Sequence, residues 1–143
     1  MEELELINEF TGEYLFLSNY FKCKITYNGY TYSSVEAAFQ AQKNPDLSYR
    51  FVGKGPNIAK HMGRRVTLRP DWEDVKVDIM RELLEIKFSD SKLRKRLLST
   101  YPKYLIEGNT WNDKFWGVDI VTGEGENHLG ELLMQVRNEL MDQ

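Results

Sequence analysis

The sequence predicts a single α+β domain over residues 1–143, with short and mostly antiparallel strands surrounded by about five helices. Three observations support this fold class. Asn28-Gly29 lies between two runs rich in Tyr, Thr and Ile, which is typical of a two-residue β-hairpin. Apolar residues recur at three- and four-residue steps between Asp71 and Phe88, which indicates an amphipathic helix. The chain shows no repeat and no linker-like segment, so we expect one core.

Short apolar runs bounded by turn residues predict the strands. A turn at Thr11-Gly12 is expected to join the first two, and Asn28-Gly29 the next two. The last two are expected on either side of a polar loop. The expected strands are 4–7, 14–17, 24–27, 30–32, 104–106 and 115–118.

Capping residues predict where helices begin. Ser33 and Glu36 have the S-x-x-E spacing of a capping box, so a helix is expected from Ser33. Asp46 and Asn127 are expected to cap two others, and Pro56 suits the first turn of a third. The expected helices are 33–43, 46–52, 56–62, 71–88 and 127–140, with a further amphipathic segment at 93–98.

Charge and composition exclude several classes of function. The formal net charge of −3 argues against a protein that holds nucleic acid by bulk electrostatics. Cys23 is the single cysteine, so no internal disulfide is expected. Without a bilayer-length apolar run or a signal-peptide pattern, we expect a cytoplasmic protein that contacts no membrane. His61 and His128 stand apart and no phosphate-loop or dinucleotide motif is present, so neither a metal nor a cofactor is expected.

The first long helix places three polar residues on one face. Glu36, Gln40 and Lys43 are spaced i, i+4 and i+7, so a carboxylate, an amide and an ammonium form one stripe. The stripe is open to two interpretations. It is either a solvated face, with Glu36 serving the capping box, or one wall of a reaction site.

Other polar residues stand where packing does not explain them. Two interrupt an apolar run, several crowd one loop, and one precedes the last helix. Taken singly, each has an ordinary explanation, because Asn and Asp favour turns and caps and Trp favours the core. These residues are Ser18, Asn19, Asn109, Asn112, Asp113, Trp116 and Asn127.

Taken together, these positions resemble the NADAR, or YbiA-like, family over nearly the whole chain. The family often has histidine after the helix glutamate, whereas this chain has Ala37, which leaves substrate choice open. The matching blocks, in chain order, are Leu17-Ser18-Asn19-Tyr20-Phe21, Tyr32-Ser33-Ser34-Val35-Glu36, Phe39-Gln40-Ala41-Gln42-Lys43, Ala59-Lys60 with Gly63-Arg64, Trp72, Met80, Lys87-Phe88, 98–100, Glu107, Asn112-Asp113, Phe115-Trp116-Gly117, Gly125, Asn127 with Leu129-Gly130, Leu133-Met134 and Val136-Arg137.

The resemblance implies hydrolysis of the bond between a ribose and a base nitrogen. Family members act on ribosylaminopyrimidine phosphates of riboflavin biosynthesis or remove ADP-ribose from guanine in nucleic acid, and both substrate classes stay open here. Glu36, Lys43 and Asp113 are the expected catalytic residues. The expected substrate-binding residues are Ser18, Asn19, Gln40, Arg64, Asn112, Trp116 and Asn127.

Two routes fit these residues. In the first, one of Glu36 and Asp113 activates water while the other assists the leaving base. In the second, a neutral Lys43 attacks the same carbon and forms a Schiff base. The alternative from another functional class is a non-catalytic module that binds NAD or ADP-ribose. The enzyme interpretation predicts that Ser33 or Ser34 caps the helix without Glu36, leaving its carboxylate in a pocket with Lys43 and Asp113.

Overall fold

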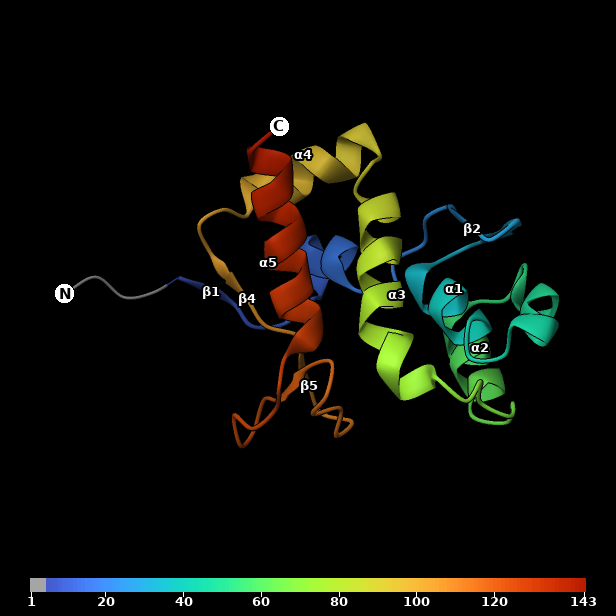
Figure 1. The fold of residues 1–143 in the computed structure, drawn as a ribbon. Helices are drawn as coiled ribbons and strands as arrows, with labels where there is room; N and C mark the ends of the chain where they lie inside the picture. The colour runs from blue at the N-terminus through green and yellow to red at the C-terminus, as the bar shows by residue number, and fades with distance from the viewer. Residues whose placement is uncertain (1–4) are drawn as a thin grey trace. The chain divides into compact units, whose positions relative to one another are not determined.

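The computed structural model describes residues 5–143, so the start of the strand expected at 4–7 lies outside the described residues. The chain divides into two compact units. The central unit is Asn19–Lys87, and the terminal unit combines Met1–Ser18 with Phe88–Gln143. Both units mix helices with very short strands, which confirms the α+β class (Figure 1).

The central unit begins with the expected hairpin. Strand β2, Ile25–Tyr27, pairs antiparallel with β3, Tyr30–Tyr32. Asn28 and Gly29 between them have φ angles of 48° and 88°. Two successive residues with positive φ form the turn type that matches the twist of paired strands. The hairpin prediction is therefore confirmed.

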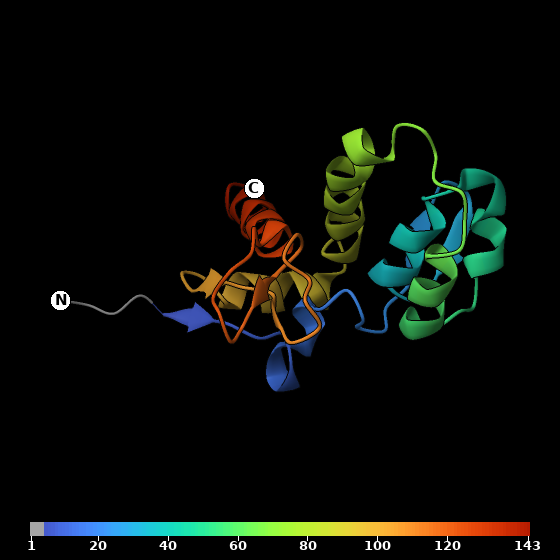
Figure 2. The same ribbon diagram turned by 90° about the horizontal axis from the view of Figure 1, so that it is seen from below.

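Three α-helices complete the central unit. They are α1, Val35–Ala41, α2, Pro56–Gly63, and α3, Trp72–Lys87. Helix α1 packs against both of the others and against the hairpin, an arrangement visible in Figures 1 and 2. Where α1 meets α3, the rings of Phe39 and Trp72 have centroids 5.0 Å apart.

The cap of α1 lies one residue later than the S-x-x-E spacing predicts. The Ser34 hydroxyl accepts a hydrogen bond from the Ala37 N–H at 3.0 Å, while the Ser33 hydroxyl donates to the Lys54 carbonyl. Glu36 is therefore the second residue of the helix, where it does not occupy the capping-box position. The capping-box interpretation is wrong, and the prediction of a serine cap without Glu36 is confirmed.

The helix expected at 46–52 is instead a 3₁₀ helix, η2, Pro45–Phe51. Asn44, rather than Asp46, holds the position before it. Pro45 explains the shift, because its fixed φ suits a first helical residue and forces Asn44 into an extended conformation.

The terminal unit corrects the expectation of mostly antiparallel strands. Strand β1, Leu6–Ile7, pairs parallel with β4, Tyr104–Leu105. Strand β5, Gly108–Asn109, pairs parallel with β6, Val118–Asp119. Only the β2–β3 hairpin is antiparallel among the three pairs within residues 5–143. Strand direction depends on which distant segment becomes the partner, and short apolar runs carry no information about that choice.

The strand expected at 14–17 is a 3₁₀ helix, η1, Gly12–Leu17. Phe16 and Leu17 are both buried, whereas Leu15 is 44% exposed, so burial does not alternate as in a half-buried strand. The Arg96 guanidinium lies 4.2 Å from the centre of the Phe16 ring and donates to the Glu13 carbonyl. These contacts favour the helical turn.

Two further helices complete the terminal unit. Helix α4, Ser91–Ser99, is capped by Asp90, whose carboxylate accepts from two backbone N–H groups. Helix α5, His128–Met141, packs against α4 and β4. Its buried Arg137 donates to the Thr100 hydroxyl at 3.0 Å. No helix within residues 5–143 combines the length and apolar character needed to cross a bilayer.

Lys87 at the end of α3 yields a stability prediction. Its side chain is 2% exposed, and burial lowers the pKa of its ammonium to about 8, although Cys23 opposes the shift. Because the folded-state pKa lies below the unfolded value, the unfolded chain binds more protons between about pH 8 and pH 10. The free energy of unfolding is therefore expected to rise across that window.

Lys87→Met is expected to remove this rise and to increase the free energy of unfolding at pH 7 by about 2 kcal/mol. Urea unfolding of both proteins at several pH values measures the effect. The same pH dependence in both would contradict the assignment.

Candidate active site

The side chain of Glu36 is buried and held in place at the start of α1. It is 8% exposed, and its Oε1 accepts a hydrogen bond from Gln40 Nε2 at 3.1 Å. Its backbone N–H donates to the Asn19 carbonyl at 3.0 Å, which ties the preceding segment to the helix. A carboxylate is rarely this buried unless it is paired with a cation, hydrogen-bonded or part of a functional site.

Lys43 lies in the turn after α1, which ends at Ala41, so the expected helix over 33–43 is shorter at this end. It still lies in the same electrostatic environment as Glu36. Burial is the largest influence and lowers the pKa of the Lys43 ammonium, while the negative charge of Glu36 raises it. Arg64, Lys60 and Lys76 then lower it further through like-charge repulsion. A lysine with a lowered pKa has a larger neutral fraction, which is the nucleophilic form.

Two buried amide oxygens belong to residues that are hydrogen-bonded to Glu36. Asn19 Oδ1 and Gln40 Oε1 have no hydrogen-bond partner among the residues that the structure describes. The Gln40 amide lies against Gly63, where an added Cβ would come within 1.9 Å of Oε1. Asn19 Nδ2 contacts the Met80 sulfur at 3.6 Å. Buried acceptors of this kind favour a ligand with hydroxyl or amine donors.

Sequence reasoning missed three residues of this site. Burial raises the pKa of the Tyr20 hydroxyl, Glu36 raises it further and Arg64 opposes the change, so Tyr20 shares their environment. Tyr20 directly follows Asn19, and that adjacency was the available signal. Lys60 on α2 and Lys76 on α3 act electrostatically on Lys43. Lys60 belongs to a matching family block, whereas no local pattern marks Lys76.

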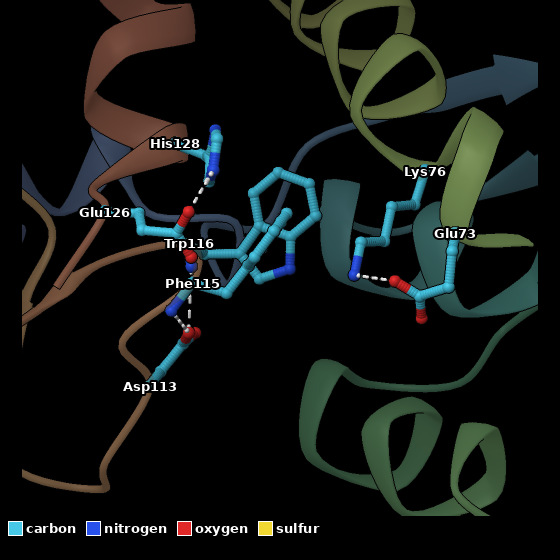
Figure 3. Close-up of polar contacts among 7 residues, drawn as sticks. All are labelled: Glu73, Lys76, Asp113, Phe115, Trp116, Glu126 and His128. Carbon is cyan, nitrogen blue, oxygen red and sulfur yellow. Dashed lines mark hydrogen bonds and ion pairs between the residues drawn. The ribbon is translucent and has the colours of Figure 1, made fainter.

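Asp113 organises the polar loop of the terminal unit. Its Oδ1 accepts hydrogen bonds from the backbone N–H of Phe115 at 3.2 Å and of Trp116 at 2.9 Å, shown in Figure 3. The Asn109 side chain bonds both the N–H and the carbonyl of Asp113. Asn112 between them is exposed and has a φ of 67°. One carboxylate oxygen of Asp113 is therefore committed to the loop.

An aromatic group follows Asp113 in the chain. The rings of Phe115 and His128 stack with centroids 4.3 Å apart, and Trp116 meets Phe115 edge-on at 4.8 Å. His128 also contacts Glu126 at 3.4 Å (Figure 3). Trp116 is half-buried, and its ring also meets the His128 ring edge-on, with centroids 6.3 Å apart.

The expected site residues fall in both units. The central unit brings together Glu36, Lys43 and Arg64 around the α1 face, with Asn19 and Gln40 beside the carboxylate. The terminal unit holds the others, namely Ser18, Asn112, Asp113, Trp116 and Asn127. The proposed approach of Asp113 to Glu36 stays a prediction.

Asn127 does not cap α5 with its side chain, which corrects the sequence expectation. Its backbone is left-handed, with a φ of 56°, and no cap hydrogen bond forms. Its Oδ1 instead accepts from the Glu107 N–H at 2.9 Å, and its Nδ2 donates to the Leu105 carbonyl at 2.9 Å. The backbone N–H groups of 127–129 donate to the carbonyls of 115–117. Asn127 thus joins the end of β4 to the helix start.

Asn127→Ala is expected to lower the free energy of unfolding by about 2–3 kcal/mol, because two backbone groups lose their partner and alanine disfavours the left-handed region. Asn127→Gly removes the same bonds but accepts the backbone, so we expect a smaller loss. Chemical denaturation measures both. Equal stability of Asn127→Ala and the unmodified protein would contradict this role.

Within residues 5–143, no group of three His, Cys, Asp or Glu side chains is placed to hold a metal ion. What the α1 face offers is a buried carboxylate, an amine with a lowered pKa and two acceptors for hydroxyl groups.

Comparison with known proteins identifies the family of this chain. The model of the NADAR domain matches residues 7–141. The chain belongs to the NADAR family. This NADAR chain is 41% identical to N-glycosidase YbiA of Escherichia coli K12 over 91% of its own length and 84% of that protein. The NMR structure of E. coli YbiA superposes with a TM-score of 0.86 at 35% identity, covering 99% of this chain and 88% of that one.

A riboflavin biosynthesis protein of Vibrio vulnificus is a more distant relative. It is 36% identical over 89% of this NADAR chain, which spans only 36% of that longer protein.

Proposed function

We propose that this protein is an N-glycosidase that hydrolyses the bond between C1 of a ribose and the nitrogen of a base. The observation that carries the proposal is the buried carboxylate of Glu36 in α1 together with Lys43, which lies in the turn after this helix and whose pKa is lowered. The 41% identity to N-glycosidase YbiA over most of both chains supports it.

The substrate is a ribosylaminopyrimidine phosphate, an intermediate of riboflavin biosynthesis. The relative from Vibrio vulnificus carries a riboflavin biosynthesis name, which supports this substrate class. Asn19 Oδ1 and Gln40 Oε1 are suited to accept hydrogen bonds from ribose hydroxyls. Trp116 stacks on the planar base and Arg64 contacts the phosphate.

Glu36 stabilises the reaction centre. Breaking the bond between ribose and base builds positive charge on the ribose ring, and a fixed carboxylate lowers the energy of that charge. The hydrogen bond from Gln40 holds the carboxylate in position. In the water route, Glu36 or Asp113 takes a proton from water, the water oxygen bonds C1, and the other carboxyl group protonates the departing nitrogen.

Lys43 provides a second route through a covalent intermediate. The ribose ring opens, the neutral amine bonds C1, the bond from C1 to the base nitrogen breaks, and that nitrogen leaves with a proton. Water then adds to the imine carbon, which releases the sugar and restores the free amine of Lys43. The lowered pKa of Lys43 supports this route.

Side-by-side assays test the function. The protein is incubated with a ribosylaminopyrimidine phosphate and, separately, with DNA carrying ADP-ribosyl-guanine, and products are identified by mass. Release of the free pyrimidine and ribose 5-phosphate in the first assay is expected. Cleavage of the DNA substrate alone would assign the second substrate class. Binding of ADP-ribose without cleavage of either would establish a binding module instead.

A further inference from the structure

Gly63 lies on α2 directly against the side chain that holds Glu36, where α2 packs on α1 (Figure 1). A Cβ added to Gly63 would come within 1.9 Å of Gln40 Oε1 and 2.8 Å of Gln40 Cδ, which is closer than unbonded heavy atoms approach. The third-nearest atom, at 3.3 Å, is Gln40 Cβ. The space that a side chain would need at position 63 is therefore occupied by the Gln40 side chain.

The backbone at position 63 does not itself require a glycine. Gly63 is the last residue of α2, and it is not among the glycines that have a positive φ. In a right-handed helix alanine is more favourable than glycine, because glycine loses more backbone freedom on folding. A glycine here thus lowers helix stability, and the feature that it makes possible is the close approach of Gln40.

The orientation of the Gln40 amide depends on this packing. Its Nε2 donates to Glu36 Oε1 at 3.1 Å, whereas its Oε1 has no hydrogen-bond partner among the residues that the structure describes. No hydrogen bond of Oε1 therefore fixes the amide, and the oxygen is enclosed at Gly63 instead. With Oε1 against α2, Nε2 is directed toward Glu36, one turn earlier on α1. Packing against α2 fixes the donor that orients the carboxylate.

We propose that Gly63 is a positioning residue for Glu36, because its missing side chain lets Gln40 adopt the conformation in which Nε2 holds the carboxylate toward C1 of the ribose. The part played by C1 rests on the proposed function, whereas the contacts from Gly63 through Gln40 to Glu36 rest on the geometry of the central unit. The Asn19 carbonyl fixes the Glu36 backbone N–H separately, at 3.0 Å. A change at position 63 therefore acts on the carboxylate and spares the start of α1.

Gly63→Ala is expected to turn the Gln40 amide away from Glu36 while the protein stays folded. The new methyl group first meets the end of a flexible side chain, which rotates at less cost than a helix backbone moves. The value of kcat for the ribosylaminopyrimidine phosphate should fall about 30-fold and KM should change less than about fivefold, since the carboxylate loses one hydrogen bond.

Gly55→Ala is the matched control. Gly55 immediately precedes the same helix, has a φ of −68° and has open space where its Cβ would be. Alanine fits there without displacing any side chain, so kcat and KM should equal those of the unmodified protein.

A double-mutant cycle with Gln40→Ala separates positioning from packing. Gln40→Ala removes Oε1 and Cδ, so Gly63→Ala then meets only the Cβ of residue 40, at 3.3 Å. Gly63→Ala is expected to lower the melting temperature of the unmodified protein but not that of Gln40→Ala. The kcat of the double variant should equal that of Gln40→Ala, because both changes remove the same hydrogen bond.

Full kcat in Gly63→Ala would overturn the proposal, as would full kcat in Gln40→Ala or losses that multiply in the double variant. The NMR signal of the Gln40 side-chain amide reports the hydrogen bond without turnover. It should shift in Gly63→Ala and stay in place in Gly55→Ala, and an unmoved signal in Gly63→Ala would also contradict the proposal. If the signal shifts but the unmodified protein cleaves no ribosylated base, the positioning of Glu36 by Gly63 stands and the N-glycosidase proposal fails.

Discussion

Glu36→Gln is expected to lower kcat/KM for the ribosylaminopyrimidine phosphate by about 10³-fold while leaving substrate binding within a few-fold. The amide keeps the size of the carboxylate and its oxygen still accepts from Gln40 Nε2, so the helix start is preserved. What is lost is the negative charge that stabilises the ribosyl cation. Initial-rate kinetics and calorimetry with the intact substrate separate the two effects.

Asp78→Asn is the matched control for this prediction. Asp78 lies exposed on α3 in the same unit, so the change removes one negative charge without touching the α1 face. Its kinetics should equal those of the unmodified protein. Comparable activity of Glu36→Gln and Asp78→Asn would remove Glu36 from the chemistry.

Sodium borohydride added during turnover is expected to attach the sugar phosphate covalently to Lys43. Reduction of the imine converts it to a stable secondary amine, so intact-protein mass rises by one sugar and peptide mapping places it at Lys43. Lys43→Met should lose both the adduct and most of the activity, by about 10²-fold or more.

Two controls make this result specific. Ribose 5-phosphate with borohydride but without substrate shows how much adduct arises from free product. Lys54→Met tests whether the labelling depends on any exposed lysine. Full activity with no adduct in the unmodified protein would favour the water route through Glu36 and Asp113.

The positive charges near Lys43 predict a change in the pH dependence of turnover. Because like charges lower the pKa of Lys43, removing one of them shifts the neutral form to higher pH. In the lysine route, the rise of kcat with pH should therefore move upward in Lys76→Met, in addition to any change in KM.

Local signals in the sequence were sufficient for several elements. Asn28-Gly29 determined the hairpin, because both residues accept positive φ at low cost. The apolar spacing between Asp71 and Phe88 determined α3, whose buried residues follow that period. The placement of Glu36 and Gln40 on one face of α1 follows from helical periodicity, whichever residue caps the helix. The periodicity did not extend to Lys43, because α1 ends at Ala41.

Non-local packing decided the features that sequence reasoning missed. The parallel pairing of β1 with β4 joins segments almost a hundred residues apart, and the sequence of neither segment indicates its partner. Residues 14–17 became a 3₁₀ helix because Arg96 from α4 covers Phe16. Asn127 was expected as a cap, but carbonyls of a preceding loop satisfy the helix N–H groups.

The sequence by itself determined the family pattern, the α+β class and the placement of Glu36 and Gln40 on one face of α1. Only the tertiary structure decided that the Glu36 side chain is buried and does not cap the helix. The capping residue is Ser34. It also decided the environment of Lys43. The cations that lower its pKa come from α2 and α3, and only packing brings their charges close enough to act.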